Sequence, residues 1–334
     1  MKQTLRLTFA TVLLAALPHH AEAADGFGTD RRPDSLSISW QGGPVGDYVF
    51  RDAKIPRPYF AILRAPDGTQ VTRNFPPVQG LDAMDHDTLH PGLWLAFGDL
   101  NGVDFWRNKG RIEHLRMVRG PRVEGGRLSF AVEEKYLAPD DAEVCRGVND
   151  FCFVAGTTLQ PALPGTLLMW STSLRRAEGP LTFGPQHEMG LGFRIATPLV
   201  VKGGSGGIVS SHGGKNEAGN WGRLGTWWDY SGIVGGKHAG ILVCAATDNP
   251  RAVWSHARDY GFLAMNPTGP PPDAKDVPSI LFTVPAGESL QMKFGILFHS
   301  STAPLNAANA ASAMRSVLKS WQPEATPSTA PLKP

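Results

Sequence analysis

The segment MDHDTLHPG, residues 84–92, places two histidines and two aspartates within a few positions. Imidazole and carboxylate groups at this density suit proton transfer, hydrogen bonding to a ligand or metal binding. His86 and His90 have a four-residue spacing that aligns side chains on a helix. Because Pro91 and Gly92 follow at once, we expect a loop instead, in which this spacing says little about a metal. Catalysis or substrate binding, a metal site and support of the loop backbone therefore all remain open.

Four further segments combine titratable and aromatic side chains with glycine. Each lies at the end of a predicted strand or in a glycine-rich connection, where β-rich proteins usually carry their sites. The segments are TFGPQHEMGLGFR (182–194), SSHGGKNEAGNWGRLGTWWDYSG (210–232), WSHARDYGFLAMNPTG (254–269) and LFHSS (297–301).

Two local patterns in these segments suggest individual roles. Glu188 stands among glycines and aromatic residues, where partial burial favours acid–base catalysis, unless it is a surface carboxylate in a turn. Trp227 and Trp228 precede Asp229. Indole rings stack on the C–H faces of sugars while a carboxylate binds hydroxyl groups, so this triplet suits a carbohydrate cleft. Its plain alternative is a pair of core tryptophans with an aspartate that caps a turn.

The segment WSHARDY (254–260) has the alternation of a strand. Trp254, His256, Arg258 and Tyr260 fall on one face of it. A strand face that carries histidine and arginine together is costly to bury without polar partners. We therefore expect this face to line a cleft.

Five longer runs occur in order over about residues 55–300: RPYFAILRAPDGTQVTRNFPP, DHDTLHPGLWLAFGDLNGVDFW, NWGRLGTWWDYSG, NPRAVWSHARDYGFLAMNPTG and PAGESLQMKFGILFH. Together they resemble an exported bacterial family, PmoA, which is catalogued as methane oxygenase PmoA. The positions that match its motifs are Asp85, His86, His90, Gly92, Trp94, Glu188, Trp221, Arg223, Trp227, Asp229, Tyr230, His256, Arg258, Asp259, Tyr260 and His299.

Two positions depart from the pattern of that family. Its opening loop usually reads Asp-His-Pro-His-His-Arg-Gly-Leu-Trp, whereas this chain lacks one histidine and has Pro91 in place of the arginine. His187 stands where the family usually has lysine. The resemblance therefore implies that a cation near the substrate is lost or moved in this chain.

A second likeness exists at the level of the fold. A strand, a histidine-containing loop and a closing PAGESLQMKF strand are similar to the supersandwich of galactose-mutarotase-like proteins. That likeness implies a carbohydrate ligand, with histidines and carboxylates on the concave face of a large sheet.

From these observations we predict an exported carbohydrate-active protein, most simply an enzyme that uses His/Glu acid–base chemistry as a hydrolase, lyase or epimerase. The alternatives are a non-catalytic glycan-binding protein and, third, a metal-dependent oxidoreductase as in the methane oxygenase name. The predicted catalytic residues are His86, His90, Glu188 and His256. The predicted substrate-binding residues are Asp85, Trp94, Trp221, Arg223, Trp227, Asp229, Arg258, Asp259 and His299.

We expect the main site residues to converge on one concave surface, although they are far apart in sequence. The six that should meet are His86, His90, Glu188, Asp229, His256 and Arg258, flanked by Trp227, Trp228 or Trp254. No cofactor and no metal are expected, because a metal would need a third, distant ligand such as His212, His256 or His299.

The elements that must position these residues are predicted to be mostly strands. DSLSISW alternates Leu36, Ile38 and Trp40 with serines, the period of a half-buried strand. Many short apolar runs follow, separated by turns rich in the 38 glycines and 28 prolines of the chain. The pattern predicts an all-β fold, a large two-sheet supersandwich, with one helix over 303–321. We expect one domain, residues 24–320.

The two ends of the chain differ from this pattern. Residues 1–23 have a basic start, a short apolar run and an Ala-x-Ala site, as in a secretory signal peptide. No later run has the length of a membrane span, so a periplasmic or secreted location is expected. The tail 321–334 is rich in proline and is predicted to be disordered. A net charge of +2 without basic clusters gives no electrostatic reason to expect nucleic acid. The oligomeric state stays open.

Three cysteines remain to be assigned. Cys145 and Cys152 flank the sequence RGVNDF and are predicted to form a disulfide that closes a short loop in an oxidising compartment. Cys244 lies in the apolar run AGILVCAAT and is predicted to be buried and unpaired.

Overall fold

The computed structural model describes residues 26–269, 271–272 and 282–323. The predicted signal peptide and residues 324–334 of the predicted disordered tail lie outside the described residues.

Within this part of the chain, two large sheets make up the fold, and all their strand pairs are antiparallel. One sheet has nine strands in the order β1 (Phe27–Arg31), β2 (Ser35–Trp40), β3 (Gly43–Val49), β4 (Tyr59–Ala61), β5 (Leu93–Phe97), β11 (Met189–Arg194), β17 (Phe262–Asn266), β16 (Val253–Arg258) and β13 (Leu224–Gly225). The other has eight strands in the order β12 (Gly207–Ser210), β14 (Trp227–Val234), β15 (Lys237–Ala245), β19 (Ser289–Ser301), β9 (Gly165–Arg175), β8 (Glu143–Ala155), β7 (Arg127–Leu137) and β6 (Arg111–Glu124). The two short strands β10 (Leu181–Phe183) and β18 (Phe282–Val284) pair separately.

The main core lies between the two sheets. Leu36 and Ile38, the alternating residues of β2, are 0% and 2% exposed and belong to it. Phe151 of β8 and Trp170 of β9 enter the same core from the eight-stranded sheet. Alternate residues of each strand face this core, so the other face of each sheet is left for separate clusters.

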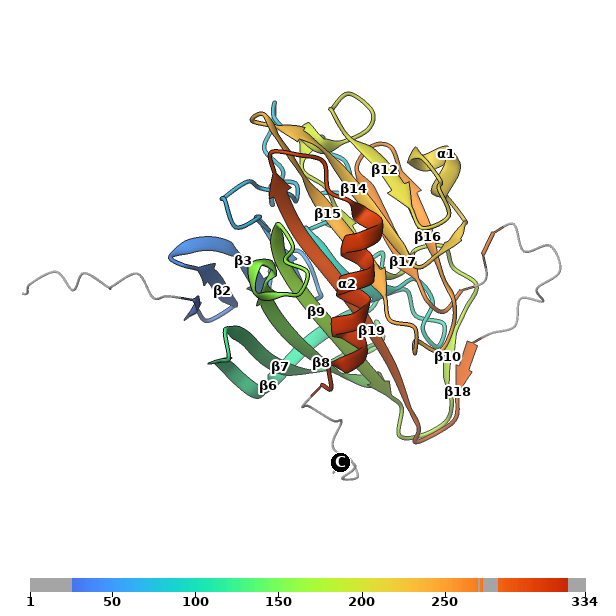
Figure 1. The fold of residues 1–334 in the computed structure, drawn as a ribbon. Coiled ribbons are helices and arrows are strands. Elements are labelled where there is room, and N and C mark those ends of the chain that lie inside the picture. The colour runs from blue at the N-terminus through green and yellow to red at the C-terminus, as the bar shows by residue number, and fades with distance from the viewer. Residues whose placement is uncertain (1–25, 270, 273–281, 324–334) are drawn as a thin grey trace, which may run out of the picture.

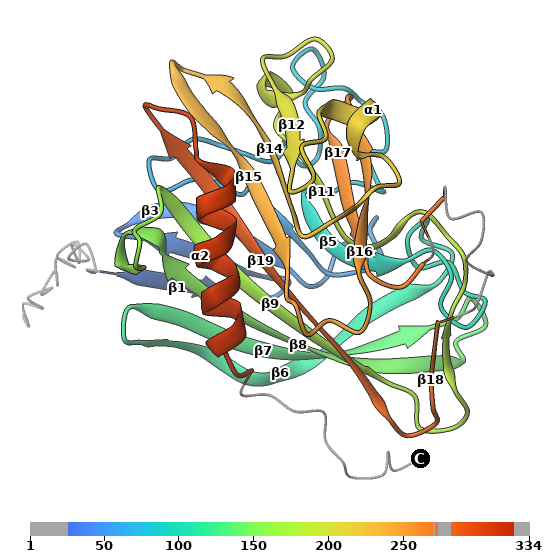
Figure 2. The same cartoon turned by 45° about the vertical axis from the view of Figure 1, so that its right-hand side comes forward.

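The outer face of the eight-stranded sheet is covered by α2 (Ala307–Ser320), shown in red in Figures 1 and 2. Met314 and Leu318 of this helix are buried against Leu242 and Leu297 of the sheet. The helix begins later than predicted, because Asn306 caps it by accepting a hydrogen bond from the backbone N–H of Asn309 at 3.1 Å. The predicted fold class, an all-β two-sheet architecture with a C-terminal helix, is confirmed. The sequence did not indicate the five-residue helix α1 (Asn216–Asn220).

The predicted disulfide is contradicted by β8. Cys145 and Cys152 do not flank a loop, because both lie in this one continuous strand. Seven steps along a strand span about 23 Å, far beyond the Cα separation of a disulfide. An odd number of steps also puts the two side chains on opposite faces, Cys145 in the main core and Cys152 under α2. Cys244 is buried under α2 as well.

Candidate functional site

The floor of the candidate site is the outer face of the nine-stranded sheet. Its register aligns Trp94 of β5, Gly192 of β11, Ala264 of β17 and His256 of β16 across four neighbouring strands. Glycine is required in this row, because a Cβ on Gly192 would lie 2.6 Å from the Trp106 ring. The intervening residues of the same strands face the main core, so strand alternation alone separates the site from the core.

Two buried arginines hold the loop 83–90 over this floor. The Arg73 guanidinium donates hydrogen bonds to the carbonyl oxygens of Ala83 and Asp85, both at 2.8 Å. Arg57 donates to the carbonyl oxygens of Leu89 at 2.5 Å and Trp106 at 2.9 Å. Burial lowers the pKa of Arg57 to about 9 and that of Arg73 to about 10. Both therefore remain cationic at neutral pH and support the loop through its backbone.

The two histidines of the loop meet because the loop contains one helical turn. The backbone N–H of His90 donates to the carbonyl oxygen of His86 at 2.9 Å. Their imidazole rings stack with centroids 4.6 Å apart and an interplanar angle of 8°. His90 is 2% exposed and continues the stack onto Phe262 at 4.7 Å. Burial, then the positive charges of His86 and Arg194, lower the pKa of His90 well below its usual value. His90 is thus a neutral support beneath His86, out of reach of a ligand on the surface.

His86 is the accessible imidazole, with 42% of its side chain exposed. Its Nδ1 lies 2.8 Å from Oδ2 of Asp85. Arg194 donates two hydrogen bonds to the same carboxylate, at 2.8 and 3.1 Å. Burial tends to raise the pKa of Asp85, but the hydrogen bond from His86 and the charge of Arg194 outweigh it, and the pKa is lowered. An ionised Asp85 makes Nδ1 the protonated nitrogen of His86 and leaves Nε2 as a proton acceptor.

His256 and Trp221 form the opposite side of the surface. The His256 ring meets Phe262 edge-on at 5.2 Å and Trp221 edge-on at 6.2 Å. Burial, then Arg258 and His187, lower the pKa of His256 to about 3, so this imidazole is neutral at physiological pH. The guanidinium of Arg258 lies 5.6 Å from the centre of the Trp221 ring.

The carboxylates of this surface are held by arginines. Glu217 of α1 binds Arg258 at 2.6 Å. Glu188 binds Arg107, which also binds Asp104 at 3.0 Å. With Asp85 held by Arg194, three carboxylates of this surface, those of Asp85, Glu188 and Glu217, each have a guanidinium partner.

Tyr260 marks the point on which these groups converge. Its ring is parallel to that of His86 at 5.9 Å. The phenol experiences the charges of Arg194, Arg258, Asp85 and Glu188. The structure therefore brings together His86, His90, Glu188, His256 and Arg258, with Asp85 and Trp221 beside them.

Three predicted site residues lie elsewhere, on the outer face of the eight-stranded sheet. Asp229 and His299 form a buried pair at 3.0 Å, and Trp227 packs against the cluster under α2. The expectation that Asp229 meets His86 is wrong, because β14 pairs with β12 and β15 and takes no part in the nine-stranded sheet. The triplet fits neither the cleft nor a turn cap: Trp228 faces the main core, whereas Trp227 and Asp229 face away from it within the continuous strand β14.

The remaining predicted residues surround the site at different depths. Trp94 is fully buried under His90, at 5.1 Å between ring centroids, and belongs to the floor. Trp254 is also buried and donates from Nε1 to the carbonyl oxygen of Gly269 at 3.0 Å. Arg223 is exposed at the rim next to Trp221. Asp259 accepts a hydrogen bond from the backbone N–H of Glu217 at 2.8 Å and so fixes the start of α1.

Sequence reasoning missed the arginines that build the site, Arg57, Arg73 and Arg194. A signal existed for Arg194, which ends the otherwise apolar strand MGLGFR, where a charge needs a partner. Arg57 and Arg73 lie in segments without regular structure, and nothing in their neighbours indicates burial.

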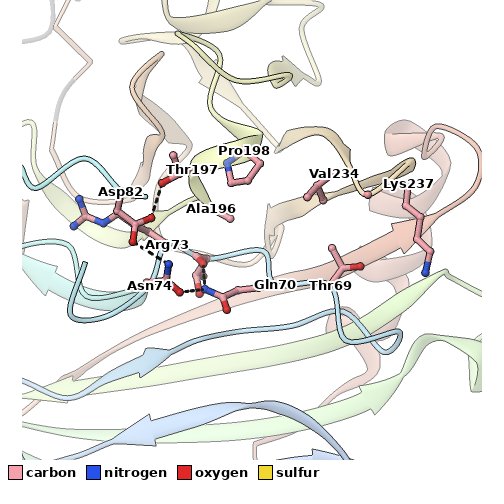
Figure 3. A pocket seen from close by; sticks show the side chains of 12 residues that line it. Thr69, Gln70, Arg73, Asn74, Asp82, Ala196, Thr197, Pro198, Val234 and Lys237 are labelled. Atoms are coloured by element: carbon pink, nitrogen blue, oxygen red, sulfur yellow. Dashed lines mark hydrogen bonds between the residues drawn. The ribbon is translucent and has the colours of Figure 1, made fainter. Parts of the chain in front are cut away.

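A pocket of about 400 Å³ lies beside Arg73 and Asp82. Figure 3 shows that its polar side chains bind one another: Asp82 accepts hydrogen bonds from Thr197 at 2.6 Å and Asn74 at 2.9 Å, and Gln70 donates to Asn74 at 2.9 Å. These side chains satisfy one another's hydrogen-bonding groups. We therefore interpret the pocket lining as structural: it holds in place the segment that leads into the loop 83–90.

Two further properties of the described residues concern metals and membranes. No group of three or more histidine, cysteine, aspartate or glutamate side chains there is arranged to hold a metal ion. None of the helices there has the length and hydropathy that a membrane span requires.

Solved structures similar to this chain include a beta-arabinopyranosidase, with a TM-score of 0.34 and 8% identity over 81% of this chain and 38% of that one. A galactose mutarotase-like protein from Lactobacillus casei has a TM-score of 0.35 and 10% identity, covering 82% of this chain and 100% of its own. A galactose mutarotase related enzyme from Lactobacillus acidophilus has a TM-score of 0.30 and 13% identity, covering 84% and 99%. This chain thus spans well under half of the arabinopyranosidase. At these TM-scores the likeness assigns no activity.

A search of the curated proteins finds no match. A family model does match, over residues 35–315, which is most of the chain and includes every strand of the two large sheets except β1. The chain therefore belongs to the family of unknown function DUF6807.

Proposed function

We propose that this protein acts on a carbohydrate and that His86 is the general base of the reaction. The observation that carries the proposal is the pair of Asp85 and His86, in which a clamped carboxylate orients a partly exposed imidazole. A base of this kind needs an orienting partner and access to the ligand, and His86 has both.

The surroundings of His86 support a sugar as the ligand. Tyr260 and Trp221 are partly exposed rings on the same surface, and such rings stack on the C–H faces of sugars. Charged groups that can bind hydroxyls stand beside them, among them Glu188 and Arg258. A few polar groups around aromatic faces are typical of small-molecule sites.

The carboxylates favour lyase or epimerase chemistry over hydrolysis. Hydrolysis by a carboxylate pair needs one protonated carboxyl group as the acid. Although burial opposes it, the pKa of Asp85 is lowered by His86 and Arg194, and Glu188 and Glu217 each bind an arginine instead of facing a second carboxyl group. Proton abstraction by an imidazole needs no protonated carboxyl group.

The test is a panel of neutral and acidic monosaccharides and oligosaccharides, assayed by NMR for epimerisation, for solvent deuterium at carbon and for unsaturated products. We expect one class to be turned over and His86→Asn to lower kcat by at least ~10²-fold, the usual contribution of a general base. His238→Asn is the matched control, because His238 lies on β15 of the other sheet and should leave kcat unchanged. Equal kcat values for His86→Asn and wild type would refute the role of His86. Binding without turnover of any sugar would favour a glycan-binding protein.

A further inference from the structure

One tyrosine of this protein differs from the other four in its exposure. Tyr48, Tyr59, Tyr136 and Tyr230 are between 0% and 2% exposed. Tyr260 is partly exposed, and among the described residues its hydroxyl group forms no hydrogen bond. A partly exposed tyrosine whose ring is held by neighbours and whose hydroxyl has no protein partner in the described part of the chain has the properties of a ligand-facing group.

The position of Tyr260 is determined by its neighbours in the site. Its ring is parallel to that of His86, with centroids 5.9 Å apart and an interplanar angle of 6°. The guanidinium carbon of Arg194 lies 4.5 Å from the centre of the same ring. Because Arg194 also binds the carboxylate that orients His86, one cation touches both Tyr260 and the Asp85–His86 pair.

We propose that Tyr260 is the proton donor that works with His86, and that Arg194 is the positioning residue that couples the two groups. This inference rests on the proposed function of the same surface. It adds a second reacting group to the surface, where His256 is buried and neutral and Asp85, Glu188 and Glu217 bind arginines.

In an elimination reaction, His86 would remove one proton from the substrate and Tyr260 would donate one to the leaving group. His86 Nε2 takes the proton of a C–H bond, and the electron pair of that bond forms the new C=C bond as the neighbouring C–O bond breaks. The leaving oxygen takes the proton of the Tyr260 hydroxyl. The imidazolium then returns its proton through water to the phenolate, so no oxidant or reductant is needed.

The charges around the phenol suit this role. Burial raises the pKa of Tyr260, although Arg194 and Arg258 oppose the increase, and Asp85 and Glu188 add to it. The hydroxyl is therefore protonated at neutral pH, while the nearby guanidinium groups are available to stabilise the phenolate that forms.

The kinetic test uses the substrate identified with the panel. We expect Tyr260→Phe to keep the fold and the ring stack and to lower kcat by at least ~10²-fold, with little change in KM. Tyr136→Phe, a change in the main core, is the matched control and should keep kcat. If His86→Asn abolishes turnover and Tyr260→Phe does not, the inference fails while the proposed function stands. If His86→Asn is fully active, the proposed function fails.

The coupling has a test that needs no substrate. Ultraviolet titration of the folded protein should detect one accessible phenol, which Tyr260→Phe removes, because the other four tyrosines are buried. Arg194→Met should raise the pKa of this phenol and Arg194→Lys should leave it closer to wild type, since lysine keeps the charge. Asp85 is less buried than Arg194, and Asp85→Asn should lower the pKa of the Tyr260 phenol because it removes a nearby negative charge. An unchanged midpoint in both Arg194→Met and Asp85→Asn would overturn the coupling, and a midpoint unaffected by Tyr260→Phe would overturn the assignment.

Discussion

At the scale of single residues, the site combines imidazoles in two different environments. His86 is accessible and held by a carboxylate, whereas His90 and His256 are 2% and 5% exposed. Buried imidazoles lose their charged form because desolvation disfavours it. Identical residue types therefore differ in role here: in the proposed reaction His86 exchanges protons with the ligand, whereas the buried His90 and His256 stay neutral.

The buried imidazoles should make the fold sensitive to acid. The pKa of His256 is about 3 in the folded protein, against the usual 6.5. The unfolded chain therefore binds a proton first as the pH falls, so stability is present above pH 6.5 and is lost between 6.5 and 3. Within that window the loss is about 1.4 kcal/mol per pH unit for one group.

Urea unfolding at a series of pH values measures this loss. Between pH 6 and pH 4 the free energy of unfolding should decrease less in His256→Asn than in wild type. The difference should be about the loss that one titrating group causes over this pH range. A parallel decrease in His256→Asn and wild type would show that other groups cause the acid sensitivity.

At the scale of elements, the site depends on a loop held by arginine side chains. Arg73 reaches the carbonyl oxygens of four residues in 83–90, those of Ala83, Asp85, His86 and His90. A loop without strand partners for its backbone needs such donors to be ordered. The positions of His86 and Asp85 thus follow from an arginine that is itself buried, at 2% exposure.

Arg73→Met should release this loop. It removes several hydrogen bonds from a charged donor, so we expect a loss on the order of 3 kcal/mol in unfolding free energy. Amide hydrogen exchange of His86 and His90 should accelerate more than that of the core strands. Arg64→Met is the matched control, because Arg64 donates to Gly68 in an exposed turn and should cost less than about 0.5 kcal/mol. Unchanged exchange in the loop of Arg73→Met would refute this account of loop order.

At the scale of the whole molecule, one buried acid links the two sheets. Glu134 of β7 accepts hydrogen bonds from the hydroxyl of Tyr48 of β3 at 3.2 Å and from the amide of Asn149 of β8 at 2.8 Å. Burial raises the pKa of Glu134 to about 7 from the usual 4.5. The unfolded chain loses this proton first, so the contribution to stability is present below pH 4.5 and is lost as the pH rises to about 7.

Glu134→Gln should remove this dependence, because an amide can accept from Asn149 and donate to Tyr48 without a charge. We expect similar unfolding free energies for Glu134→Gln and wild type at pH 5. At pH 8 the variant should be more stable, by on the order of 2 kcal/mol. Thermal and urea unfolding at the two pH values check this, and a variant that is less stable at both would mean that the carboxylate is needed in its charged form.

Local pattern alone predicted much of this protein. Alternation in DSLSISW, the frequency of glycine and proline, and the apolar spacing near the C-terminus predicted strands, turns and α2, because these depend on neighbours in sequence. The same alternation placed His256 and Arg258 on one strand face, as they are in β16. Loops near strand ends were also a sound indication of where His86 and Glu188 would lie.

Only the tertiary structure decided which sheet each strand joins and what covers each face. Asp229 has the same local appearance as a site residue, yet β14 belongs to the other sheet and turns it towards α2. Cys145 and Cys152 look like the ends of a loop, yet long-range pairing with β7 and β9 keeps that segment extended. The apolar strand that ends at Arg194 indicated that this arginine needs a partner, but only the tertiary structure identified the partner as Asp85, 109 positions away in sequence. A strand specifies two faces through its own residues, but the pairing that gives each face its neighbours is a contact between distant segments.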